Sequence, residues 1–323
     1  MAVITMREAI SQALWEEMER DERVFIMGEE VGVWGGSYAV TKGFYDHFGP
    51  KRVRDTPIAE GVIVGAANGA AMAGLRPVAE LMTVNFAFLA MDQIVNHSAK
   101  LHSMFGGQFA LPLVIRTVGG AGRQLGATHS QTPDVVFAHF PGLKVVAPGT
   151  PGDAKGLLKS AIRSDDPVMF IEHATLYQLR GEVPEGQILE PIGVSKIQRQ
   201  GEDITIITYS KMLQTSLLAA DQLAKEGIEA EVVDLRTLRP LDLKPVLESF
   251  KRTNRAVIVE EGWQSYGLGA EVAARLYEQA FDYADAPIRR VAQKEVPLPY
   301  NRTLEQLALP QVEDVVRAVR GVL

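Results

Sequence analysis

The chain has 323 residues and a formal net charge of −7, from 33 Lys and Arg against 40 Asp and Glu. A length of this order, with 46% hydrophobic and 23% charged residues, is typical of a globular protein of about two domains. The acidic balance argues against a nucleic-acid binder and against adhesion to an anionic membrane. The absence of cysteine excludes disulfides, cysteine nucleophiles, and Cys-ligated zinc or iron–sulfur centres.

The N-terminal sequence carries acidic residues where a secretory signal needs an apolar run. The most apolar long stretch, residues 61–91, includes Asn68, Arg76 and Glu80, so it does not read as a bilayer-spanning helix. We therefore expect a protein of a reduced compartment, either the cytoplasm or, in a eukaryote, an organelle matrix.

The first half of the chain alternates helices with short apolar strands. Thr5 and Glu8 fit a capping box, and Ile10, Leu14 and Met18 then form one apolar stripe on the helix that follows. A buried strand at 24–27 comes next and ends in a glycine-bearing loop. Further helices are predicted near 59–75, 86–104, 131–138 and 153–163, with strands near 77–82, 112–118, 143–147 and 167–172.

A second alternating series follows a charged stretch that contains proline and glycine and has no sustained period. Its predicted strands are 204–210, 230–235, 256–261 and 288–291, and its predicted helices are 212–226, 242–251, 267–280 and 311–320. Apolar strands that alternate with helices indicate parallel sheets covered on both faces. The predicted fold is therefore α/β with two doubly wound domains, residues 1–185 and 203–323, joined by a linker at 186–202.

Nucleotide-binding motifs give no support for a phosphate site. No Gly-Lys-Ser/Thr tripeptide of a P-loop occurs. The glycines of 262–269 depart from the dinucleotide fingerprint, and the bulky Trp263 and Tyr266 would obstruct a pyrophosphate. We expect these glycines to ease the packing of a helix on a strand.

Glu60 follows a strand end and Pro57, in the first turn of a helix rich in glycine and alanine. Such small residues let other backbones approach closely. One interpretation is that Glu60 only complements the helix dipole. The other is that a partly desolvated carboxyl group exchanges a proton with a heterocyclic nitrogen.

His129 lies in a glycine-rich loop, residues 119–131, between a predicted strand and the next helix. The carboxyl ends of parallel strands are where such folds bind ligands. His129 is thus the histidine best placed to act as an acid or base, although an isolated histidine is often structural. No zinc-type spacing occurs, and Asp165-Asp166 reads either as a solvated turn or as ligands of a hard cation.

The runs MGEEVG, RVRDTPIAEGVIVGAANGAAMAGLRPVAE, DQIVN, HSQTPDVVFAHFPGLKVVAP, DAKGLLKSAIRSDDPV and VPLPY occur in this order along nearly the whole chain. Together they resemble the beta subunit of the decarboxylating component of 2-oxo acid dehydrogenases, a family with pyruvate, branched-chain and acetoin enzymes. The resemblance implies a pyrimidine-binding domain followed by a transketolase-type C-terminal domain.

The resemblance also implies thiamine diphosphate and particular site residues. Glu60 matches the carboxyl group that hydrogen-bonds the N1′ nitrogen of the aminopyrimidine and promotes the tautomer that deprotonates the thiazolium. Phe86 matches the aromatic residue packed on the pyrimidine, and Met82 lies beside it. His129, in the HSQ motif, matches the histidine associated with acyl transfer to the lipoyl group.

The family's diphosphate–magnesium motif, Gly-Asp-Gly with a later Asn, does not occur in this chain. The resemblance therefore implies an alpha subunit that holds Mg²⁺ and the diphosphate, in a heterotetramer of two alpha and two beta chains that serves a lipoyl-bearing dihydrolipoyl acyltransferase core. It also implies a structural potassium ion at Leu113, Ala161, Ile162 and Asp166, with Ser164 standing where relatives often carry an acidic residue.

The substrate implied by GRQLGATHSQ and Phe86 is pyruvate, with branched-chain 2-oxo acids and acetoin as alternatives. A split transketolase that moves ketol units between sugars is a second enzymatic hypothesis. A non-catalytic nucleotide-binding or assembly subunit is an alternative of another class.

Overall fold

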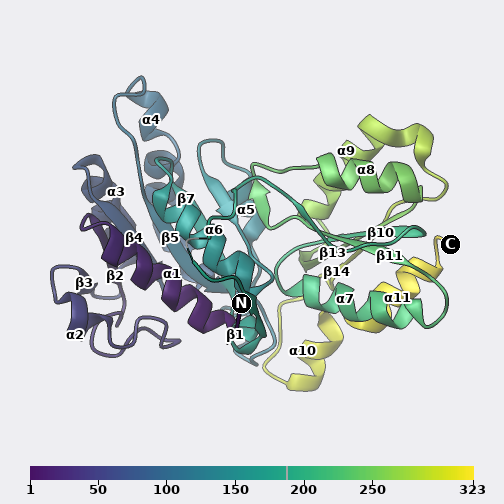
Figure 1. Ribbon diagram of the computed structural model, residues 1–323, viewed down its shortest axis with the longest axis horizontal. Helices are drawn as coiled ribbons and strands as arrows, with labels where there is room; N and C mark the ends of the chain where they lie inside the picture. The colour runs from purple at the N-terminus through teal and green to yellow at the C-terminus, as the bar shows by residue number, and fades with distance from the viewer. Residues whose placement is uncertain (187) are drawn as a thin grey trace. The chain divides into compact units, whose positions relative to one another are not determined.

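The computed structural model describes residues 1–186 and 188–323, which form two compact units (Figure 1). The first unit contains residues 1–119 and 136–192, and the second contains residues 120–135 and 193–323. Gln187, within the predicted linker, lies outside the described residues. The boundary after Ile192 falls inside the segment 186–202, but the units differ from the predicted ranges because the loop 120–135 groups with the second unit.

The first unit is built on a parallel sheet with strand order β6-β7-β5-β4-β2-β3. Its strands are β2 (Val24–Gly28), β3 (Val53–Asp55), β4 (Arg76–Leu81), β5 (Val114–Gly119), β6 (Lys144–Val146) and β7 (Val168–His173). A separate antiparallel pair is formed by β1 (Ala2–Thr5) and β8 (Arg180–Val183). The helical segments are α1 (Met6–Arg20), α2 (Phe44–Phe48), α3 (Glu60–Met72), η1 (Val84–Ala90), η2 (Asp92–Ser98), α4 (Leu101–Met104), α6 (Pro151–Arg163) and η3 (Ala174–Gln178), and α5 (Asp134–Ala138) begins at the unit boundary.

Helix α1 has the predicted capping box. Thr5 N–H donates to the Glu8 carboxylate at 2.7 Å, and Glu8 N–H donates to Thr5 Oγ1 at 3.2 Å. The predicted stripe of Ile10, Leu14 and Met18 is buried in the main core of this unit. Both predictions are confirmed.

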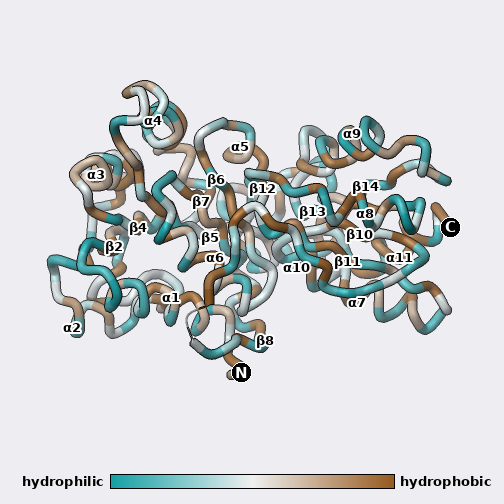
Figure 2. The backbone as a smooth tube through the Cα atoms, turned by 45° about the horizontal axis from the view of Figure 1, so that its top comes forward, coloured by the Kyte–Doolittle hydropathy of each residue, from teal (hydrophilic) through white to brown (hydrophobic). Residues whose placement is uncertain are grey.

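Helices cover both faces of this sheet. Successive residues of a strand point to opposite faces, so alternate residues of β2 contact different helices. Val24 and Ile26 of β2 belong to the core shared with α1 and α6. Phe25 and Met27, the alternate residues, line a cavity of about 290 Å³ together with Ala66 and Ala70 of α3. Strand β7 of the same sheet is buried along its whole length, as expected for a strand covered on both faces, and brown, hydrophobic stretches mark the strands of this sheet in Figure 2.

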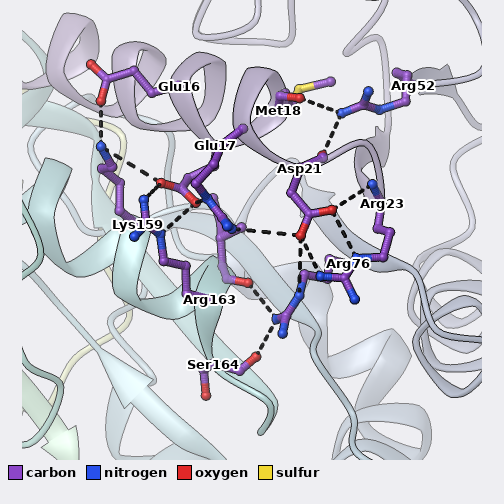
Figure 3. A network of polar contacts seen from close by, with 12 residues as sticks. Glu16, Glu17, Met18, Asp21, Arg23, Arg52, Arg76, Lys159, Arg163 and Ser164 are labelled. Atoms are coloured by element: carbon purple, nitrogen blue, oxygen red, sulfur yellow. Dashed lines mark hydrogen bonds and ion pairs between the residues drawn. The ribbon is translucent and has the colours of Figure 1, made fainter. Parts of the chain in front are cut away.

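Ion pairs fasten α1 to α6 (Figure 3). Glu17 is fully buried and accepts hydrogen bonds from Arg163 at 2.7 and 2.9 Å, while Lys159 pairs with Glu16 at 2.6 Å. Because α6 ends just before the turn that leads into β7, these contacts also fix the position of residues 164–166.

The second unit has a five-stranded sheet of order β14-β13-β10-β11-β9, parallel except for β9. Its strands are β9 (Lys196–Arg199), β10 (Ile204–Thr208), β11 (Ala230–Asp234), β13 (Ala256–Trp263) and β14 (Arg289–Gln293), with the short strand β12 (Thr237–Arg239). Its helices are α7 (Lys211–Ala224), α8 (Lys244–Thr253), α9 (Leu268–Ala280), η4 (Phe281–Tyr283), α10 (Arg302–Ala308) and α11 (Val312–Arg320).

Helices cover both faces of this sheet as well. Ile204 and Ile206 of β10 share a core with α7 and α11. The intervening Thr205 hydrogen-bonds Ser249 of α8 at 2.6 Å on the other face. Two sheets with helices on both faces confirm the prediction of a doubly wound α/β fold, although β9 lies within the predicted linker and α10 was not predicted.

The helix predicted at 86–104 is wrong in type. The structure has the 3₁₀ segment η1, the π segment η2 and the short helix α4 in its place. The segment has a partner from another helix: Asn68 Nδ2 of α3 and Ser98 Oγ both donate to Gln93 O, and Ala99 N–H bonds Ile94 O five residues back. Across the described residues, none of the helices is both long and apolar enough to cross a membrane.

Candidate active site

Glu60 is the first residue of α3 and is only 3% exposed. It lies near the carboxyl ends of β2, β3 and β4, where Gly28 is in register with both Asp55 and Glu80. The peptide dipoles of α3 favour a negative charge at this first turn, and the side chain is almost fully removed from solvent. The predicted partly desolvated Glu60 is thus present in the structure.

Glu29 is a second acidic residue of this site, which the sequence analysis did not single out. It directly follows β2, is 4% exposed, and its Oε1 has no hydrogen-bond partner among the described residues. Burial, and then the nearby Glu60 and Glu80 carboxylates, raise the pKa of Glu29. The signal in the sequence was its position, since Glu29 follows a buried strand as Glu60 follows β3.

The small residues of α3 let neighbouring segments approach this helix closely, as predicted. A Cβ atom at Gly61 would lie 3.4 Å from Leu89 O, and one at Gly65 would lie 3.1 Å from Gln93 Oε1. Helix α3 therefore lies close to η1, which carries Phe86. Phe86 and Met82, just after β4, are both half-buried in the same unit as Glu60.

Buried polar atoms near these strand ends lack partners within the described residues. They are Glu29 Oε1, Thr56 Oγ1 directly after β3, and Asn85 Nδ2 beside Phe86. Buried polar groups are nearly always hydrogen-bonded, so unpaired ones suggest a polar ligand. A half-buried aromatic ring, an acid and unpaired donors fit a flat heterocycle such as an aminopyrimidine.

The glycine-rich loop with His129 belongs to the second unit, whereas Glu60 belongs to the first. His129 is exposed, and its Nδ1 lies 2.8 Å from Thr128 Oγ1. Ser130 next to it is buried, and its Oγ has no partner in the part of the chain that the structure describes. An exposed imidazole on a loop can reach a macromolecular substrate.

The glycines of 262–269 ease packing, as predicted. A Cβ atom at Gly267 would lie 2.4 Å from Glu260 Oε1, and Gly269 N–H donates to that oxygen at 3.0 Å. The Glu260 side chain thus lies at the start of α9, the position that holds the phosphate in phosphate-binding folds.

Asp134, Glu260 and Glu261 form a cluster of buried carboxyl groups in the second unit, and Glu261 also contacts the His129 loop. Burial, and then Glu261 and Glu260, raise the pKa of Asp134 to about 7. Burial likewise raises the pKa of Glu260 to about 7. Between about pH 4 and pH 7 the folded protein therefore retains protons that the unfolded chain has released, so stability falls as the pH rises through this range.

Replacing Asp134 with asparagine is expected to raise Tm at about pH 8 more than at about pH 4, because the amide resembles the protonated acid. Thermal melts of wild type and Asp134→Asn across this range measure the effect, with the exposed Asp282→Asn as control. If the difference in Tm between wild type and Asp134→Asn is the same at every pH, Asp134 does not titrate in this way.

The four residues proposed for a potassium ion lie around one turn. Val168 N–H donates to Leu113 O and Ser164 N–H to Ala161 O. Two basic side chains also contact this turn: Arg76 donates to Ile162 O at 3.0 Å, and Lys144 pairs with Asp166 at 2.8 Å. No group of three or more His, Asp or Glu side chains suited to a metal occurs within the described residues.

The potassium ion would be held largely by backbone carbonyl oxygens of this turn, and it stays a prediction. If the ion binds, we expect a higher Tm in potassium chloride than in choline chloride of equal ionic strength, since a ligand of the folded state stabilises by mass action. Equal Tm values in the two salts would contradict the potassium site.

Comparison with known families defines the class. The description "Transketolase, pyrimidine binding domain" matches residues 2–180, and "Transketolase, C-terminal domain" matches residues 193–315. A solved structure titled "Split gene transketolase, inactive beta4 tetramer" superimposes with a TM-score of 0.81 at 26% identity, covering 100% of this chain and 99% of that one. The chain is thus a transketolase-type protein, of a family that depends on thiamine diphosphate.

Closer relatives identify the particular family. The "Pyruvate dehydrogenase E1 component subunit beta" of Rickettsia felis is 51% identical over 319 residues, which is 99% of this chain and 98% of the relative. The mitochondrial "Pyruvate dehydrogenase E1 component subunit beta-2" of Oryza sativa subsp. japonica is 49% identical over 98% of this chain and 85% of its own length. The chain belongs to the family of pyruvate dehydrogenase E1 beta subunits.

Proposed function

We propose that this chain is the beta subunit of a heterotetramer of two alpha and two beta chains. The enzyme oxidatively decarboxylates pyruvate with thiamine diphosphate and acetylates a lipoyl domain, which makes it an oxidoreductase that acts on an oxo group with a disulfide acceptor. The observation that carries the proposal is the buried Glu60 at the start of α3, beside Glu29 and near η1 with Phe86. The names of the relatives support the same function.

Thiamine diphosphate supplies the electron sink that side chains lack. The task of this chain is to bind and orient the pyrimidine. Glu60 would hold a proton in a hydrogen bond with the N1′ nitrogen, in a site from which burial excludes water. Phe86 and Met82 would pack against the ring.

The diphosphate and its Mg²⁺ fall to the alpha subunit in this proposal, because this sequence has no motif for them. The beta chain alone is therefore expected to be inactive. A lipoyl-bearing acyltransferase core is the proposed acceptor, and the cytoplasm or an organelle matrix is the proposed location. The domain ranges 1–185 and 203–323, with a linker at 186–202, stay a prediction.

Reconstitution with the alpha subunit tests the function. The expected result is lipoyl-domain acetylation with pyruvate, and slower or no turnover with branched-chain 2-oxo acids, acetoin and sugar phosphates. A preference for another substrate would replace pyruvate in the proposal, and no thiamine-dependent turnover with any of them would refute it.

His129 is proposed to act in acyl transfer. His129→Ala is expected to slow acetylation of the lipoyl domain by about a hundredfold or more, the usual range for loss of an acid or base. Decarboxylation with ferricyanide as acceptor should change far less, and so should thiamine diphosphate binding. His139→Ala provides a control, and normal acetylation by His129→Ala would remove His129 from the proposal.

A further inference from the structure

The His129 loop is held by two carboxylates from distant parts of the second unit. We propose that Glu261 and Glu305 are positioning residues, which fix this loop so that His129 is presented to the acyl acceptor. The inference rests on the role proposed for His129, but its structural half can be tested separately.

Glu305 holds the first part of the loop. It lies on α10 and is fully buried. Its Oε1 accepts a hydrogen bond from Gly122 N–H at 3.0 Å, and its Oε2 accepts one from Gln124 Nε2 at 2.8 Å. Gln124 N–H, at 3.3 Å from both oxygens, is shared between them. Hydrogen bonds to an ionised acceptor are about twice as strong as neutral ones.

Glu261 joins the two ends of the same loop. It lies near the end of β13, and its Oε1 accepts from Ala121 N–H at 2.9 Å and from Thr132 Oγ1 at 2.9 Å. These donors stand on either side of His129 in the sequence. Gly120 N–H also donates to Gln131 O at 3.3 Å, which closes the base of the loop.

The backbone of the loop needs such support. Gly120, Gly122 and Gly126 have φ values of 87°, 95° and 78°, and Gln124, which is not glycine, has a φ of 54°. Left-handed backbone at a residue with a Cβ atom costs free energy and persists where surrounding contacts impose it. The three glycines therefore permit an unusual backbone path at these positions.

Apolar packing holds the loop from the same direction. Ala121 shares a small buried cluster with Leu298, Ala308 and Leu309. A Cβ atom at Gly126 would lie 2.6 Å from the ring of Tyr300. The VPLPY turn and α10 thus pack against the loop, and Glu305 and Glu261 hydrogen-bond to it.

Buried carboxylates are costly to desolvate. Two of them that hydrogen-bond one glycine-rich loop therefore indicate that the conformation of this loop is important. A displacement of about 1 Å at a reacting group can cost a hundredfold in rate. Loss of either carboxylate should therefore affect the step that uses His129 and leave the steps that depend on Glu60 nearly unchanged.

The experiment uses the reconstituted heterotetramer with Glu305→Gln, Glu261→Gln and, as a control, the exposed Glu313→Gln of α11. Lipoyl-domain acetylation should fall by about 10- to 100-fold in the first two variants, while ferricyanide-linked decarboxylation stays within about threefold. Hydrogen exchange of peptides spanning 120–135 should become faster. In a His129→Ala background, Glu305→Gln should cause no further loss of acetylation.

If Glu305→Gln does not fold, Gln124→Ala and Thr132→Val remove the loop's side-chain donors and should show smaller losses of the same step. Equal losses in both half-reactions, or unchanged acetylation with faster exchange, would overturn the positioning role. Unchanged exchange would overturn the anchoring itself. Normal acetylation by His129→Ala would instead show that the proposed role of His129 is wrong.

Discussion

Glu60→Gln is expected to lower turnover of the reconstituted enzyme with pyruvate by at least about a hundredfold. Glutamine keeps the size of the side chain and can still form a hydrogen bond, but it cannot hold and return a proton. Because Glu60 is 3% exposed, solvent water has little access to replace it. Assembly and Tm should stay close to those of the wild-type protein.

The matched control is Glu22→Gln, which removes an exposed carboxylate from the same unit. Steady-state rates, gel filtration of the complex and circular dichroism separate a loss of chemistry from a loss of structure. Wild-type turnover in Glu60→Gln would contradict the proposed function and favour the non-catalytic alternative.

Arg116→Met is expected to lower the free energy of unfolding by about 3–5 kcal/mol, the range for breaking a buried ion pair from one side. Arg116 lies on the central strand β5 and is 1% exposed. Its guanidinium pairs with Glu80 of β4 and donates to both oxygens of Glu172 of β7, at 2.5 and 2.7 Å. The variant would leave two buried carboxylates without their cation.

The control is Arg275→Met, which breaks an exposed pair with Glu271 one helical turn away. Such pairs contribute about 1 kcal/mol or less. Denaturant unfolding measures both variants, and Arg116→Met combined with Glu172→Gln should recover part of the loss. A cost for Arg116→Met no larger than that for Arg275→Met would show that the buried network adds little stability.

Patterns among residues that are close in sequence predicted most of the long helices and the sheet strands. Apolar strands such as 167–172 and the striped helix after Thr5 depend on neighbours in sequence, and the structure has both. Glu60 was recognisable for the same reason, since a strand end, a proline and a helix start adjoin it. Each of these features can be read within a short window of the sequence.

The missed features depend on distant partners. The π segment η2 has a partner from another helix, since Asn68 of α3 donates to the carbonyl of Gln93. Glu305 lies on a seven-residue helix with no strong period, and its link to the His129 loop is apparent only from its contacts with Gly122 and Gln124. No spacing rule relates such positions, so the arrangement of the His129 loop could not be predicted.

The order of synthesis has a consequence for this loop. Gly122 contacts Glu305, which lies 183 residues further along the chain. A ribosome therefore releases the sheet of the first unit before α10 is made, and the His129 loop gains its contacts with Glu305 only after that helix has been synthesised. Chains truncated before α10 would lack the hydrogen bonds that Glu305 makes with the His129 loop.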